Sequence, residues 1–262
     1  MALTDDQFER YARHLILDEV GEEGQEALLA AKVLVVGAGG LGAPLLLYLG
    51  AAGVGTLGIV DDDVVDLTNL QRQVVHTTAA IDAPKVDSAA ATVRRLNPDV
   101  RVVTHNARLT AANAAEMIAA YDIVADGSDN FATRYLLNDA SRLAGKTLVT
   151  AALLRFEGQL FTFKEGAPCY RCVFPEAPPA DLVPRCEEAG ILGALCGVMG
   201  SLQATEVMKE LIGVGDSLAG HMLLYDALGP TFHKIKLKRD PACALCGEAP
   251  AITDLSSHAG AV

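Results

Sequence analysis

The feature that most constrains the fold is a stretch without a charged residue, positions 33–60. Eight glycines and Pro44 divide it into a strand candidate at 32–36, a glycine-rich turn, a helical segment at 41–52 and a strand candidate at 56–60. An uninterrupted apolar stretch of this length would favour a membrane span. The interrupted pattern instead predicts a soluble α/β unit that does not associate with a membrane.

Strand and helix patterns continue to alternate up to residue 151. The helical candidates are 84–96, 111–120 and 132–144, and the strand candidates are 101–104, 122–125 and 147–151. This alternation predicts an α/β fold with a Rossmann-like, doubly wound and mainly parallel sheet. A capping box at Thr4–Gln7 and apolar residues at helical spacing predict helices within residues 1–30.

The sequence pattern changes after residue 151. The expected elements are antiparallel strands at 153–163, 170–174, 223–226 and 231–238, a long buried helix at 192–212, and a proline-rich crossing loop at 175–190. We predict a single domain over residues 1–262. In it, a nucleotide-binding part at 31–151 is followed by a part at 152–262 that continues the sheet.

Two Cys-x-x-Cys pairs stand far apart in the chain, Cys169–Cys172 and Cys243–Cys246. Four thiolates at this spacing suit a tetrahedral, structural zinc site with no open position for substrate. The alternatives are two disulfides or four unrelated core thiols. The first residues lack the basic start and apolar stretch of a secretion signal, so we expect a cytoplasmic protein, in which disulfides are rare.

The glycine-rich turn predicts a nucleotide site. Gly37, Gly39, Gly40 and Gly42 follow the first strand candidate and open a helix, which is the context of the dinucleotide fingerprint. Asp61 ends the next strand candidate, where an acidic side chain commonly accepts hydrogen bonds from ribose hydroxyls. These residues alone indicate a nucleotide, with NAD as the first expectation.

Further polar residues cluster where later strands end, and they change that expectation. They are Asp63, Asn69, Arg72, Gln73, Lys85, Ser128, Asp129 and Asn130. In a doubly wound sheet these positions meet at one crevice, and two cations with a carboxylate suit a triphosphate and its magnesium. Taken singly, Arg72 can be a surface charge and Asp129 a helix cap.

In combination these motifs resemble those of the MoeB/ThiF adenylyltransferases, relatives of the ubiquitin-activating enzymes. The resemblance rests on the glycine turn, Asp61 and Asp63, Asn69 to Gln73, Lys85, Ser128 to Asn130 and both cysteine pairs. It extends from Arg10-Tyr11-x-Arg13 to Cys246. Thr68, where serine is expected, is a mild departure.

The resemblance implies ATP-dependent adenylation of the C-terminal glycine of a ubiquitin-fold sulfur carrier that ends in Gly-Gly. It assigns Asp61 to ribose, Arg72 and Lys85 to phosphates, and Asp129 to magnesium. Asn69 and Gln73 would line the site. Arg13 would reach the ATP of the partner subunit in a homodimer, and the alternative for it is an exposed helix charge.

The part at 152–262 is the expected carrier-binding part, and within it the proline-rich segment 175–186 is the expected cover over the carrier's tail. Within this segment, Cys186 either forms a covalent link to the carrier or is dispensable. Arg185 beside it would lower the pKa of its thiol, whereas Glu187 and Glu188 would raise it. The whole-chain likeness favours molybdenum cofactor biosynthesis, and a thiamin-thiazole carrier remains the alternative. The sulfur donor would be a cysteine desulfurase or a rhodanese.

Two other classes compete with this hypothesis. An NAD-dependent oxidoreductase shares the glycine turn and Asp61 but leaves Arg72, Lys85 and Asp129 unexplained. A non-catalytic half of a heterodimeric activating enzyme would be expected to lose phosphate ligands. The net charge of −12 argues against nucleic-acid binding, which requires clustered Lys and Arg.

Overall fold

The computed structural model describes residues 3–178 and 190–259. At its centre is an eight-stranded sheet with the order β3-β2-β1-β4-β5-β6-β7-β8. The strands are β1 Lys32–Val36, β2 Thr56–Val60, β3 Arg101–His105, β4 Ile123–Asp126, β5 Thr147–Leu154, β6 Glu157–Phe163, β7 His221–Asp226 and β8 Thr231–Lys236. The first five are parallel to one another, and β6, β7 and β8 continue the sheet in antiparallel order. The predicted fold class is therefore confirmed.

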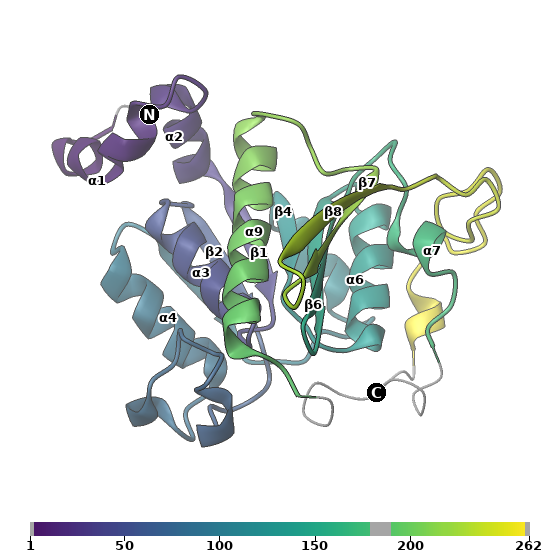
Figure 1. The fold of residues 1–262 in the computed structure, drawn as a ribbon, viewed down its shortest axis with the longest axis horizontal. Helices are drawn as coiled ribbons and strands as arrows, with labels where there is room; N and C mark the ends of the chain where they lie inside the picture. The colour runs from purple at the N-terminus through teal and green to yellow at the C-terminus, as the bar shows by residue number, and fades with distance from the viewer. Residues whose placement is uncertain (1–2, 179–189, 260–262) are drawn as a thin grey trace.

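Helices cover both faces of this sheet (Figure 1). The α-helices are α1 Asp5–Leu15, α2 Gly21–Ala30, α3 Gly42–Ala51, α4 Lys85–Leu96, α5 Ala114–Ala119, α6 Phe131–Leu143, α7 Tyr170–Val173 and α9 Gly193–Ile212, and the 3₁₀ turns are η1 Leu67–Asn69, η2 Thr78–Ala80 and η3 Ser256–His258. The packing of α3, α4 and α9 against one face and of α5 and α6 against the other follows from the two apolar cores.

The alternation of side chains along each strand supplies both cores. In β1, Val33 and Val35 belong to the core beneath α3 and α9, whereas Leu34 and Val36 belong to the core beneath α6. All four are buried, because a central parallel strand is covered on both faces. This explains why β1 is an uninterrupted apolar run in the sequence.

Two expectations about the second half of the chain were wrong in detail. Residues 170–174 are not a strand, because Tyr170–Val173 is the short helix α7, whose turn brings Cys169 and Cys172 to the same side. The single strand expected at 153–163 is divided by a tight turn in which Arg155 has a φ of 55°, so β5 and β6 form a hairpin.

The remaining differences are smaller. The helix expected at 111–120 is shorter, since α5 spans Ala114–Ala119 and the preceding turn is held by the Asn113 side chain. The long helix expected at 192–212 is confirmed as α9. Most of the expected crossing loop at 175–190, including Cys186, lies outside the described residues.

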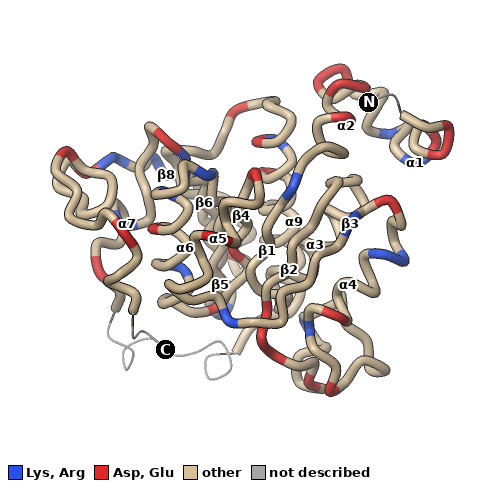
Figure 2. Tube along the Cα trace, turned by 180° about the vertical axis from the view of Figure 1, so that it is seen from behind, with Lys and Arg blue, Asp and Glu red and all other residues tan. Residues whose placement is uncertain are grey.

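Charged residues are distributed unevenly along the fold. Figure 2 shows acidic residues gathered on α1 and α2 and where the chain leaves β2, with Lys and Arg interspersed elsewhere. Among the residues that the structure describes, no helix combines the length and apolar character that a bilayer crossing requires.

Candidate active site

The glycine turn between β1 and α3 is backed by the turn that follows β4. Gly37 has a φ of 95°, and a Cβ at this position would lie 2.8 Å from the carbonyl oxygen of Gly127. A Cβ at Gly42 would collide with the carbonyl of Gly37. Both positions therefore require glycine, and the two turns lie side by side at the carboxyl edge of the parallel strands.

Asp61 fixes the glycine turn from the end of β2. Its Oδ2 accepts the N–H of Ala38 at 2.7 Å, and its Oδ1 accepts the N–H of Asp63 at 2.9 Å. Burial raises the pKa of the Asp61 carboxyl, although both backbone donors oppose that shift. Each carboxylate oxygen has further acceptor capacity, so Asp61 can still receive a ribose hydroxyl.

Lys85 brings a buried cation to the same edge. Its backbone N–H bonds the Asp63 carbonyl at 2.9 Å, and its Nζ lies 2.8 Å from Oδ2 of Asp63. Lys85 is the first residue of α4, so the position of its side chain is set by the N-terminus of that helix.

Arg72 and Gln73 close the other side of the glycine turn. The Arg72 stem lies beside Gly40, since a Cβ there would be 3.6 Å from the Arg72 Cδ, and its Nη1 donates to the Thr68 carbonyl at 3.1 Å. Gln73 is buried against Gly39, and its Oε1 is buried without a hydrogen-bond partner among the described residues. An orphaned buried acceptor beside an open backbone turn fits a bound polar ligand.

Asp129 and Asn130 follow the β4 turn that backs the glycine turn. Asp129 is exposed, whereas Asn130 is the N-cap of α6, with its side chain accepting the Thr133 N–H at 2.9 Å. Asn69 has a similar local role, because its side chain accepts the Asp66 N–H at 3.2 Å in a capping box of η1. Both asparagines therefore shape turns beside other predicted residues, since Asn130 follows Asp129 and the Asn69 carbonyl accepts the backbone N–H groups of Arg72 and Gln73.

Arg13 lies away from the other predicted site residues of the same chain. It is exposed in the last turn of α1, which packs near the C-terminal ends of α3 and α4 through Tyr11 and Arg10. The glycine turn is at the opposite end of α3, a helix of 10 residues and about 15 Å. Figure 1 shows α1 beyond one end of the sheet, beside α2.

The four predicted metal ligands converge into one cluster. The Sγ–Sγ distances are 4.0 Å for Cys169–Cys172, 3.6 Å for Cys169–Cys243, 3.3 Å for Cys172–Cys246 and 3.4 Å for Cys169–Cys246. A zinc–sulfur bond of about 2.3 Å implies an edge of about 3.8 Å for a sulfur tetrahedron. Burial raises the pKa of the Cys169 and Cys172 thiols, so a cation is needed to hold these two as thiolates. Both properties of the donor set fit zinc.

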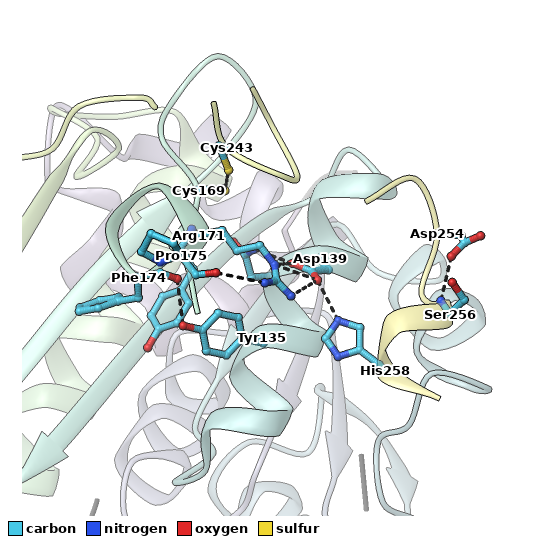
Figure 3. A network of polar contacts seen from close by, with 12 residues as sticks. Tyr135, Asp139, Cys169, Arg171, Phe174, Pro175, Cys243, Asp254, Ser256 and His258 are labelled. Atoms are coloured by element: carbon cyan, nitrogen blue, oxygen red, sulfur yellow. Dashed lines mark hydrogen bonds and ion pairs between the residues drawn. The ribbon is translucent and has the colours of Figure 1, made fainter. Parts of the chain in front are cut away.

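A buried ionic network lies beside this cluster (Figure 3). Asp139 is fully buried and receives Nε and Nη2 of Arg171 at 2.8 Å each, and His258 Nε2 lies 2.8 Å from its Oδ2. The Arg171 guanidinium also lies 4.8 Å from the ring centroid of Tyr135. Since Arg171 stands between Cys169 and Cys172, the network ties the cysteine cluster to α6 and to η3.

A family model described as the ThiF family matches residues 11–245 of the chain. The chain belongs to the ThiF family. This ThiF-family chain is 53% identical over 248 residues to the SAMP-activating enzyme E1 of Haloferax volcanii, covering 95% of this chain and 92% of that protein. It is 50% identical over 264 residues to the sulfur carrier protein adenylyltransferase of Thermus thermophilus, covering 98% of this chain and 97% of that protein.

Longer relatives contain the same unit. Identity to the adenylyltransferase and sulfurtransferase MOCS3 of Sus scrofa is 52% over 261 residues, which are 99% of this chain and 57% of that protein. Among solved structures, E. coli MccB has a TM-score of 0.80 at 19% identity, covering 92% of this chain and 74% of that one. This similarity shows that the ThiF-family chain shares the fold.

Sequence reasoning missed three residues that hold the site of this ThiF-family chain. Asp126 is fully buried at the end of β4 and accepts the N–H and hydroxyl of Ser128 at 2.9 and 2.6 Å. Arg134 donates to the Ser128 carbonyl at 3.3 Å and lies 3.6 Å from Asp126. The third residue, His76, bonds the glycine turn. A charged residue ending an apolar strand was the available signal for Asp126.

Proposed function

We propose that this chain uses ATP to adenylate the C-terminal glycine of a ubiquitin-fold sulfur-carrier protein and releases pyrophosphate. One observation carries the proposal: Asp61, Arg72 and the turn before Asp129 border the glycine turn of a ThiF-family fold, and Lys85 pairs with Asp63 beside Asp61. The names of the Thermus and MOCS3 relatives, a sulfur carrier protein adenylyltransferase and an adenylyltransferase and sulfurtransferase, support this activity.

The proposed reaction requires positioning rather than a general base. A C-terminal carboxylate, with a pKa of about 3.5, is already ionised at neutral pH. One of its oxygens forms a bond to the α-phosphorus while the bond to the β-phosphate oxygen breaks, and pyrophosphate leaves with that electron pair. Arg72 and Lys85 neutralise charge on the phosphates, and Asp61 holds the ribose. Asp129 would hold magnesium, which supplies further charge neutralisation when bound.

The location of Arg13 supports a shared site in a homodimer. Because α1 packs at the far end of α3, Arg13 would act on the ATP of the partner subunit. Mixing Arg13→Ala with Asp129→Ala subunits tests this, since a mixed dimer contains one complete site. Return of activity supports the shared site. If no activity returns in mixtures shown to exchange subunits, Arg13 is an exposed charge with no role in the site.

The carrier is proposed to bind to the part at 152–262, with its Gly-Gly tail under segment 175–186. We favour a carrier of the molybdopterin-synthase type, with the thiamin-thiazole type as the alternative. Pulldown with each carrier from the same organism distinguishes them. A cysteine desulfurase or rhodanese would then supply sulfur in the cytoplasm. Cys186→Ala would leave adenylation intact, because adenylation precedes any thiol step.

The competing NAD-dependent oxidoreductase and non-catalytic scaffold explain fewer residues. Neither requires Arg72, Lys85 and an exposed Asp129 around one glycine turn. Calorimetric titration of the full chain with magnesium-ATP and with NAD tests the nucleotide. The proposal expects binding of ATP in preference to NAD, and tight NAD binding with no response to ATP would overturn it.

A further inference from the structure

His76 is a buried side chain whose two ring nitrogens both have partners. Nε2 lies 2.9 Å from the carbonyl oxygen of Ala38, and Nδ1 lies 2.9 Å from the hydroxyl of Ser88. A carbonyl can only accept, so the neutral ring carries its proton on Nε2. Nδ1 then accepts the hydroxyl proton of Ser88. The ring is thus held in one tautomer and one orientation.

These two bonds connect three segments of the proposed site: the glycine turn, the start of α4 with Lys85, and the segment that contains Arg72. Ala38 belongs to the glycine turn, and Ser88 is in the first turn of α4, which begins at Lys85. His76 itself ends the short segment that starts with Arg72 and Gln73, and its backbone N–H bonds the Gln73 carbonyl at 3.0 Å. One ring therefore sets the spacing between all three.

The glycine turn is held on both sides at a single residue, Ala38. Asp61 accepts the Ala38 N–H at 2.7 Å, while His76 donates to the Ala38 carbonyl at 2.9 Å. Helix N-terminal amides that bind a phosphate must already point at it before the nucleotide arrives, because reorientation costs binding energy. A turn fixed at both polar groups of Ala38 meets this requirement.

We propose that His76 is a positioning residue that orients the glycine turn toward the nucleotide phosphates through the Nε2–H bond to Ala38. Its Nδ1 bond to Ser88 ties the start of α4, which carries Lys85, to the same turn. The identity of the nucleotide as ATP rests on the proposed function, and the role of His76 in phosphate binding does not. If His76 has this role, loss of its bond to Ala38 should lower the affinity for ligands that carry phosphate and leave the affinity for other ligands unchanged.

Two substitutions separate the two bonds of the ring. The amide nitrogen of His76→Gln reaches the place of Nε2 and retains the donor to Ala38. The amide oxygen of His76→Asn takes the place of Nδ1 and retains the acceptor for Ser88, but the bond to Ala38 is lost. His258→Asn is the matched control, since it removes one histidine hydrogen bond far from the glycine turn.

The dissociation constants of magnesium-ATP and of adenosine are measured by calorimetry on the full, zinc-loaded chain. For ATP, His76→Asn is expected to weaken binding about tenfold, as one lost backbone hydrogen bond predicts, and His76→Gln less than threefold. Adenosine affinity should stay unchanged in both, and His258→Asn should lower thermal stability without changing either affinity.

Equal ATP affinities for His76→Gln and His76→Asn would overturn the role of His76. Equal losses of affinity for ATP and for adenosine would overturn it too, because a general loosening of the fold would weaken the binding of both. If His76→Asn does not fold, Ser88→Ala is used instead, because it removes the bond to Nδ1 and keeps the bond from Nε2 to Ala38. It should weaken ATP binding two- to threefold. Should the wild type bind NAD and not ATP, the proposed function fails. The same variants measured with NAD against adenosine then decide the role of His76 separately.

Discussion

The ammonium nitrogen of Lys85 lies 2.8 Å from a carboxylate oxygen of Asp63, although the two side chains are 7% and 68% exposed. A buried ammonium needs a partner, because an unpaired charge away from water is costly. Under the proposed function, phosphate oxygens replace the exposed carboxylate, which then turns toward solvent. Asp63 would therefore hold the cation in place until a nucleotide binds.

Replacing Lys85 by Met should weaken ATP binding by about 10- to 100-fold, because a charge-assisted phosphate contact contributes about 1.5–3 kcal/mol. Asp63→Asn should weaken ATP binding less than tenfold, because it leaves the Lys85 ammonium in place. Calorimetric titration gives both values, and Lys146→Met, a half-buried lysine directly before β5, is the control. Wild-type affinity in Lys85→Met would contradict the assignment.

The four-cysteine cluster should hold about one zinc per chain in freshly purified, reduced protein. Cys172→Ser and Cys246→Ser should lose the metal and expose the segment after β8 to hydrogen exchange, while exchange at the glycine turn stays unchanged. Elemental analysis measures the zinc. Cys196→Ala, a buried thiol outside the cluster, should retain it, and zinc-free wild-type protein would refute the assignment.

Asp139→Asn should lower the free energy of unfolding by about 3 kcal/mol, because it leaves the Arg171 guanidinium without its buried counter-charge. His258→Asn should cost about 1 kcal/mol, the usual value for one hydrogen bond. Denaturant unfolding of the zinc-loaded protein measures both. A larger loss for His258→Asn than for Asp139→Asn would show that Arg171 does not depend on this carboxylate.

The stability of the protein should fall in mild acid partly through His76. Burial lowers the pKa of His76 below its ordinary value of 6.5, and the nearby Lys85 ammonium acts in the same direction. The unfolded chain therefore takes up this proton first, so the stabilisation is present above pH 6.5 and is lost as the pH falls toward the native pKa. His76→Gln should lack this component, and identical pH dependence of unfolding in both proteins would exclude it.

Local chemistry explains which parts of this account the sequence could predict. The apolar run of β1, the glycine turn and the carboxylate of Asp61 follow from hydrophobic periodicity and turn chemistry, both of which are local. The helix α7 could not be predicted, because Tyr170–Val173 is apolar enough for a strand and its turn is set by the distant Cys243 and Cys246. His76 was missed because its partners, Ala38 and Ser88, are apart in sequence.

Carrier-dependent exchange of labelled pyrophosphate into ATP tests the proposed adenylation most directly, because formation of the carrier adenylate is reversible. With a carrier ending in Gly-Gly, the wild-type protein should catalyse exchange. Asp129→Ala should abolish it, and a carrier lacking the final glycine should not support it. Exchange that proceeds equally without any carrier, or its absence with every sulfur carrier of the same organism in protein that binds ATP, would contradict the account.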